Sequence, residues 1–271
     1  MWQRWKPQRP LNSNPPHKTE ALPNSWPWHV SRRQYAALGG YPYCGGTLIA
    51  RKWVLTAAHC IYNVLQCRPV TYGQLFDIYA VTGYDMAVSV ADHQYTTGDR
   101  PSYNIRVTGV VIHPYFGQGN NGFERALLQL GREVKRSSRT EYAFLPEPGS
   151  TLTVGQFCYF AGWGLLPNPP IVPIADPPEN LMELQMPIIS NSECKRAYPF
   201  MNEMQDVCTY GANGMACHGD SGGGLHCLNG SKWFVYGVST YGEDLCFGGF
   251  NGFALTAPKV DWINNLISSY P

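Results

Sequence analysis

Short runs of β-branched and aromatic residues recur along the chain from Ser25 onward, and glycine, proline or asparagine residues separate them. Four such runs are Thr47-Leu48-Ile49, Trp53-Val54-Leu55, 107–112 and 233–238. Runs of this length and composition between turn-forming residues are typical of strands in a sandwich or barrel. The pattern therefore predicts an all-β domain.

Two segments depart from this pattern. Residues 1–24 are rich in proline, asparagine and arginine without periodicity, which indicates an irregular or mobile N-terminal arm. Residues 259–267 show helical spacing, because their apolar positions fall on one face: Val260, Ile263, Leu266 and Ile267. Pro258 stands just before them, where a helix start tolerates proline. We expect a C-terminal surface helix packed against the last barrel.

Composition limits the class of protein and its partners. The 271 residues suffice for one large all-β domain or two small ones. Hydrophobic residues make up 44% of the chain, charged residues only 14%, and the net charge is +1. This balance gives no indication of nucleic acid or an anionic membrane as partner. No apolar run approaches the length of a membrane span.

The chain has nine cysteines, spread out and without a Cys-x-x-Cys pair of zinc type. This spread favours disulfides in an oxidising compartment, and hence a secreted protein, over a metal site. The first seven residues contain no apolar stretch of signal-peptide length. The sequence is therefore compatible with a mature form, a fragment or an incomplete gene model.

The segment Gly219-Asp220-Ser221-Gly222-Gly223 is the first candidate for chemistry. Glycines permit a tight loop that exposes the Ser221 hydroxyl and points the N–H groups of Gly219 and Ser221 into one cavity. Such donors hold an oxyanion when a serine attacks a carbonyl. A plain glycine-rich turn is the alternative. The segment Thr56-Ala57-Ala58-His59-Cys60 supplies a candidate base, unless His59 is a buried histidine bonded to backbone.

The chain resembles the chymotrypsin-like (trypsin-fold) serine peptidases from Ser25 onward. The landmarks follow the family's order: Ser25-Trp26-Pro27-Trp28, Cys44-Gly45-Gly46-Thr47-Leu48-Ile49, Trp53-Val54-Leu55-Thr56-Ala57-Ala58-His59-Cys60, Ala126-Leu127-Leu128-Gln129-Leu130, Gly162-Trp163-Gly164 and Gly219-Asp220-Ser221-Gly222-Gly223. The resemblance implies a peptidase domain over residues 25–271, built from two antiparallel six-stranded β-barrels with the site between them.

The resemblance also implies the catalytic roles. Ser221 would be the nucleophile, His59 the base, and Glu124 the carboxylate that orients the imidazole. Glu124 departs from the family's aspartate, and Arg125 stands where an aliphatic residue is usual. The alternative is that Glu124 and Arg125 are ordinary surface charges and the triad is degenerate.

Asp220 has a further role in the family, where its carboxylate accepts an N-terminal amine created by activation cleavage. Counting back from Trp26, that terminus is expected within residues 15–18, but the family's Ile-Val-Gly-Gly is absent there. The residue directly before Pro15 is not basic, and Arg9 is followed by proline, which makes it a poor site for activation cleavage. Because an unpaired buried carboxylate costs several kcal/mol, we expect that another group meets Asp220 or that its loop is loose.

The specificity pocket is predicted from the same resemblance. Its floor would be Met215, where trypsin-like members have an aspartate, and its walls would be Thr240, Tyr241, Gly242 and Gly252. An uncharged, flexible floor residue with open glycine walls favours apolar substrate side chains, aromatic or medium aliphatic. The alternative is that Met215 blocks the pocket.

The family's spacing implies four disulfides: Cys44–Cys60, Cys158–Cys227, Cys194–Cys208 and Cys217–Cys246. Cys67 then remains, either as a free thiol or in a bridge to another chain.

Two functions are compatible with these residues. The first is a secreted serine endopeptidase that works through an acyl-enzyme, with protein or peptide substrates and protein inhibitors as partners. The second is a catalytically inactive homologue that acts as a binding or regulatory module, which Glu124, Arg125 and the missing activation terminus favour. No cofactor, metal, nucleic acid or membrane partner is expected.

Overall fold

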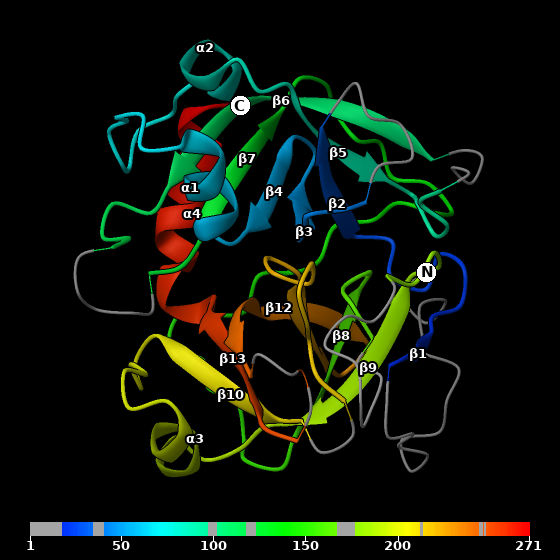
Figure 1. The fold of residues 1–271 in the computed structure, drawn as a ribbon, viewed down its shortest axis with the longest axis vertical. Coiled ribbons are helices and arrows are strands. Elements are labelled where there is room, and N and C mark those ends of the chain that lie inside the picture. Colours follow the sequence, from blue (N-terminus) through cyan, green and yellow to red (C-terminus); the bar gives the residue numbers. More distant parts are fainter. Residues whose placement is uncertain are drawn as a thin grey trace.

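A computed structural model describes residues 18–34, 41–96, 102–117, 123–166, 177–211, 214–243, 246 and 248–271. Its strands form two units, one above the other in Figure 1. The upper unit, called the first barrel, is closed in the order β2-β3-β4-β7-β6-β5. Its strands are β2 (His29–Gln34), β3 (Cys44–Ala50), β4 (Trp53–Thr56), β5 (Met86–Val90), β6 (Tyr103–Ile112) and β7 (Ala126–Leu130).

The lower unit, called the second sheet, has seven strands in the order β1-β9-β8-β11-β12-β13-β10. They are β1 (Thr19–Glu20), β8 (Phe157–Gly162), β9 (Met182–Pro187), β10 (Asp206–Tyr210), β11 (Gly224–Asn229), β12 (Lys232–Gly242) and β13 (Phe250–Leu255). The predicted all-β fold is confirmed, but regular pairing does not close this unit among the described residues. An isolated bridge between Ile188 and Thr209 brings the chain after β9 next to β10, so the sheet curls toward closure.

The alternation of buried and exposed side chains along the sequence explains why these segments form strands. In β6, Ile105 and Val107 are buried while Arg106 and Thr108 are exposed, the period of two that a half-buried strand requires. Buried apolar residues fill each unit; the second sheet packs around Phe160, Leu184, Met186, Leu225 and Phe253.

The C-terminal helix is confirmed, but its predicted packing partner was wrong. Helix α4 (Val260–Ser269) follows a short 3-10 turn, η2 (Ala257–Lys259). It runs back to the first barrel rather than packing on the unit it leaves (Figure 1). The Trp262 ring lies 4.8 Å from that of His113, and Gln129 of β7 donates to the Tyr270 carbonyl at 3.4 Å. The helix thereby buries Ile263 within the core cluster that contains the first barrel.

Residues 18–24, which the sequence assigns to the irregular arm, are part of the packed structure. Thr19 and Glu20 pair with Glu183 and Met182 of β9, and Ala21 is buried. Residues 1–17 lie outside the described part.

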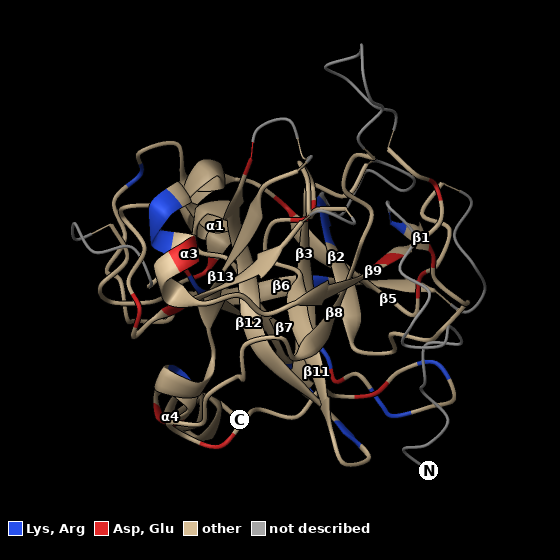
Figure 2. Cartoon of the chain, turned by 90° about the horizontal axis from the view of Figure 1, so that it is seen from below, with Lys and Arg blue, Asp and Glu red and all other residues tan. Residues whose placement is uncertain are grey.

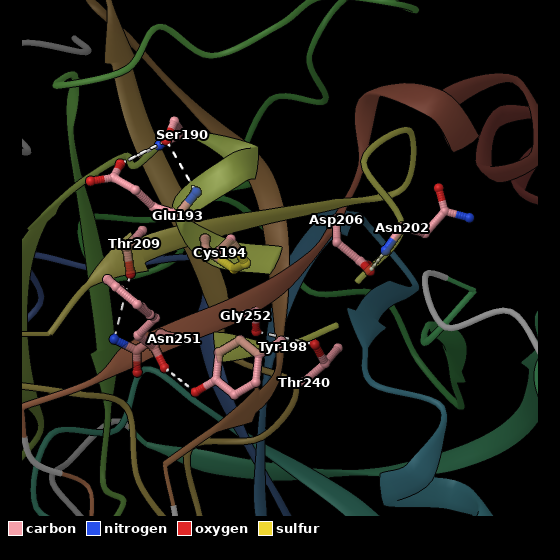
Figure 3. The surroundings of a disulfide bond; sticks show 12 residues. Ser190, Glu193, Cys194, Tyr198, Asn202, Asp206, Thr209, Thr240, Asn251 and Gly252 are labelled. Atoms are coloured by element: carbon pink, nitrogen blue, oxygen red, sulfur yellow. Dashed lines mark hydrogen bonds between the residues drawn. A yellow bond between two sulfur atoms is a disulfide. The ribbon is translucent and has the colours of Figure 1, made fainter. Parts of the chain in front are cut away.

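Four disulfides are present, and they are the pairs that the resemblance implied: Cys44–Cys60, Cys158–Cys227, Cys194–Cys208 and Cys217–Cys246. Cys67 is an exposed free thiol. The Cys194–Cys208 bridge fastens helix α3 (Asn191–Ala197) to β10 (Figure 3).

The two remaining helices belong to the first barrel: α1 (His59–Leu65) and α2 (Ile78–Thr82). None of the described helices is both long and apolar enough to cross a membrane. Basic and acidic residues lie interspersed along the ribbon in Figure 2.

Candidate active site

The register of two strands brings His59 and Glu124 together. Strand β4 pairs antiparallel with β7, and Thr56 lies opposite Ala126. His59 follows Thr56 by three residues and Glu124 precedes Ala126 by two, so both lie at the same end of this strand pair. One oxygen of Glu124, Oε1, accepts hydrogen bonds from the His59 backbone N–H and from Nδ1, each at 2.7 Å.

This contact has a chemical consequence for the imidazole. When Nδ1 donates to a carboxylate, Nε2 of the neutral ring carries the lone pair and is available as a base. The side chains of His59 and Glu124 are 28% and 20% exposed, so the pair is partly shielded yet accessible from solvent.

Ser221 lies at the same junction between the two units. Its carbonyl accepts a hydrogen bond from the Gly45 N–H in β3 at 2.8 Å. The Cys60 sulfur lies 3.7 Å from that carbonyl oxygen and 3.9 Å from His59 Nε2, so the Cys44–Cys60 bridge stands beside both residues. Within the described residues, no hydrogen bond joins the Ser221 hydroxyl to His59. Such bonds are often long before substrate binds.

The backbone around Ser221 suits anion binding. The N–H groups of Gly219 and Ser221 donate to no other residue in the described part of the chain. Gly219 has φ of +96°, a conformation that favours glycine. A side chain there would also collide with the Tyr41 hydroxyl, which donates to the His218 carbonyl at 3.1 Å.

Asp220 is buried, and three groups meet its carboxylate. Oδ1 accepts from the Gly164 N–H and Oδ2 from the Cys217 N–H, both at 2.8 Å. The third partner is the ammonium of Lys18, which forms an ion pair with Oδ2. The sequence predicted that another group meets Asp220 or that its loop is loose, and the first alternative holds. The sequence around Lys18 did not predict that its ammonium pairs with Asp220, because Lys18 lies in a segment without periodicity.

Arg125 is fully buried, which contradicts the alternative that it is a surface charge. Burial lowers the pKa of its guanidinium to about 10, although the neighbouring carboxylates of Asp206 and Glu124 oppose that shift. Its Nη2 donates to the Leu255 carbonyl in β13 at 2.5 Å. Arg125 therefore remains a cation at neutral pH and links the first barrel to the second sheet, directly beside Glu124.

The predicted pocket residues divide between two places. Met215 is fully buried, and its methyl carbon lies 3.6 Å from the position that a Cβ at Gly242 would take. Gly252 lies instead beneath the Tyr241 ring, which a Cβ at 252 would strike. The Thr240 hydroxyl donates to the Gly252 carbonyl at 3.1 Å (Figure 3).

Asn251 is a neighbour of Met215 that the sequence did not indicate. Its Oδ1 accepts from the Ala216 N–H at 2.8 Å, which ties strand β13 to the residue after Met215. Figure 3 shows its amide reaching toward Thr209 on β10, and the Asn251 Nδ2 to Thr209 Oγ1 distance is 3.5 Å. A buried asparagine that links three segments has no periodicity that would reveal it.

The residues present do not offer a metal site here. Cys44, His59 and Cys60 place potential ligand atoms within 4.8 Å of one another. Both sulfurs belong to one disulfide, whereas metals bind cysteine as the thiolate.

The paired β units and the loop around Ser221 define a protein of the trypsin fold. The Trypsin family model matches residues 17–263, and the chain belongs to this family of serine peptidases. It is 31% identical over 263 residues to chymotrypsin-like elastase family member 1 of Homo sapiens, covering 93% of this chain and 91% of the relative. Serine protease 28 of Mus musculus is 30% identical over 258 residues, with coverage of 90% and 86%.

Proposed function

We propose that this chain is an active serine endopeptidase in which Ser221 is the nucleophile, His59 the base and Glu124 the orienting carboxylate. The observation that carries this proposal is the double contact of Glu124 Oε1 with His59, at 2.7 Å to both Nδ1 and the backbone nitrogen. A side chain one methylene longer than aspartate therefore reaches the imidazole without losing a hydrogen bond.

The mechanism follows from these positions. The Ser221 oxygen attacks the carbonyl carbon of the scissile bond while its proton passes to His59 Nε2. The carbonyl oxygen becomes an oxyanion, held by the N–H groups of Gly219 and Ser221. The intermediate collapses, the C–N bond breaks, and His59 returns its proton to the leaving amine. Water then attacks the acyl-enzyme in the same way, which releases the acid and restores Ser221.

The substrate side chain in this proposal is apolar. Met215 and Gly242 offer no charge, and a Lys or Arg side chain placed against them would lose its hydration without gaining a counter-charge. The partners are protein or peptide substrates, together with protein inhibitors. The four disulfides support export to an oxidising compartment, where Cys67 is free to remain a thiol or to bridge to another chain.

The alternative, an inactive homologue that serves as a binding or regulatory module, has one observation in its favour. The Ser221 hydroxyl makes no hydrogen bond to His59 within the described residues, so the nucleophile is not visibly activated. Both functions require the same fold, and they differ only in the reactivity of Ser221.

Labelling with a fluorophosphonate separates the two, because the reagent reports an activated serine. We expect the purified chain to be labelled once and to hydrolyse apolar peptide esters. The Ser221→Ala variant should lose all labelling, whereas Ser231→Ala, which alters an exposed serine, should keep it. A folded parent protein that no treatment renders reactive would establish the inactive module instead.

A further inference from the structure

The Lys18–Asp220 ion pair is buried between the start of β1 and the loop that carries Ser221. The side chains are 1% and 0% exposed. Lys18 Nζ also donates to the Gly164 carbonyl at 3.2 Å. An ammonium or a carboxylate left alone in such surroundings costs several kcal/mol, so each group depends on the other.

The fold holds Lys18 in this place from both sides. Thr19 and Glu20 pair with β9, and the Ala21 N–H donates to the Leu181 carbonyl at 2.8 Å. On the other side, the carboxylate of Asp220 fits into a space that only glycines leave open. A Cβ at either Gly162 or Gly164 would collide with it.

Asp220 in turn shapes the backbone on either side of it. Its carboxylate binds the Cys217 N–H, its own N–H donates to the Cys217 carbonyl at 2.8 Å, and its carbonyl accepts from the Gly223 N–H at 3.0 Å. Gly219 and Ser221, the two oxyanion donors, flank it in the sequence. Fixing the Asp220 side chain therefore fixes the direction of both N–H groups.

A side-chain ammonium differs from a terminal amine in one respect that matters for regulation. A terminal amine at this place exists only after the chain is cut, whereas the Lys18 ammonium exists in the uncut chain. We propose that Lys18 is a positioning residue that sets the oxyanion loop in the uncut chain, so that catalysis requires no cleavage of the N-terminal segment. This inference rests on the proposed peptidase function.

The test uses the full 271-residue chain and reads two properties of the same sample. Fluorophosphonate labelling measures reactive Ser221, and intact mass shows whether the labelled molecules retain all residues before Lys18. We expect uncut molecules to be labelled. The Lys18→Met variant should lose at least about 10²-fold in kcat, the size of effect seen when one oxyanion donor is lost. Lys195→Met, which removes an exposed lysine paired with Glu203, should keep parent activity.

Two further variants separate positioning from folding. In Lys18→Ala, propylammonium added to the assay should restore part of kcat, because a small cation fits the space left by the side chain; a purely structural loss would not respond. Should Lys18→Met or Lys18→Ala fail to fold, Lys18→Met/Asp220→Asn contains no unpaired buried charge. It should fold yet remain at least about 10²-fold less active than the parent.

These experiments test the role of Lys18 and the proposed peptidase function separately. Labelling confined to molecules cut before or near Lys18 overturns the inference and leaves the peptidase function standing. Parent-level activity in Lys18→Met, or in the double variant, also overturns it. A folded protein that is never labelled, cut or uncut, removes the proposed function and the inference together.

Discussion

Single side chains decide how well the proposed catalytic residues fit together. Glu124, the proposed orienting residue, carries its carboxylate on a longer stem than aspartate, and its Oε1 still contacts both His59 Nδ1 and the His59 backbone nitrogen at 2.7 Å. The backbone therefore places a glutamate side chain within hydrogen-bonding distance of the imidazole. A shorter side chain in the same place would leave a gap at the imidazole.

This geometry predicts that Glu124→Asp lowers kcat. Aspartate places its carboxylate on the order of 1 Å short, and a misplacement of that size costs about 10²-fold in turnover. Glu124→Gln removes the charge while nearly preserving the shape, and in the family template that change costs about 10⁴-fold. Measuring kcat on an apolar peptide ester checks both values. Parent-like kcat in Glu124→Gln would show that Glu124 is not the orienting group.

The uncharged side chain of Met215 predicts the substrate specificity. Substrates with Phe, Tyr, Leu or Met before the cut should exceed those with Arg or Lys by at least about tenfold in kcat/KM, about 1.4 kcal/mol. Met215→Ala should raise the ratio of Phe to Leu cleavage by roughly tenfold, because it removes buried volume at the pocket floor. Met204→Ala alters a methionine that is 75% exposed and should leave the ratio unchanged. Equal cleavage after Arg would contradict this view of the pocket.

At the scale of elements, the chemistry depends on how the first barrel meets the second sheet. The Gly45 N–H of β3 holds the Ser221 carbonyl, and Arg125, just before β7, binds the Leu255 carbonyl in β13. Asp206 at the start of β10 is the strongest favourable charge for the buried guanidinium. Burial raises the pKa of Asp206 to about 6, against the opposing effects of the Asn202 N–H (Figure 3) and of Arg125.

Arg125→Met tests this connection between the two units. At pH 7.5 it removes the favourable positive charge near the ionised Asp206 carboxylate, together with the hydrogen bond to the Leu255 carbonyl. It should therefore lower the free energy of unfolding by about 3 kcal/mol. At pH 5 Asp206 is largely protonated and needs no cation, so the loss should be smaller. Arg106→Met removes a 47% exposed arginine paired with Asp85 and should cost at most about 1 kcal/mol. Urea unfolding at both pH values gives the comparison; an equal loss in the two arginine variants would contradict it.

At the scale of the whole molecule, buried histidines set the response to acid. His29, His113 and His226 are buried, and desolvation lowers the pKa of each imidazole to about 3. A depressed histidine pKa means that the unfolded chain binds protons first. Stability is therefore lost as the pH falls below the ordinary value of 6.5. Asp206 acts in the opposite direction, because a raised carboxyl pKa adds stability as the pH falls through about 6.

The free-energy contributions of the three histidines are larger than that of Asp206. Between pH 7 and pH 5 each histidine should cost about 2 kcal/mol, whereas Asp206 should return only about 1 kcal/mol. The free energy of unfolding should therefore fall over this interval, as urea titrations at several pH values would show. His226→Phe should reduce the fall by about 2 kcal/mol, and Asp206→Asn should deepen it by about 1 kcal/mol. A stability that is flat from pH 7 to pH 5 would contradict the buried neutral state of these rings.

The sequence by itself determined the all-β class and the C-terminal helix, because the composition and spacing of short runs are local properties of the chain. Its ordered motifs carried the resemblance that implied the family and the four disulfide pairs. Tertiary structure alone decided the rest. Helix α4 returns to the first barrel because its apolar face is covered there, β1 joins the second sheet through backbone bonds that leave no pattern in two residues, and the buried states of Arg125 and Asn251 depend on distant strands. Lys18 and Asp220 lie 202 positions apart. The sequence near either residue does not predict the other as its partner, because an ion pair depends on where the folded backbone places the two charges.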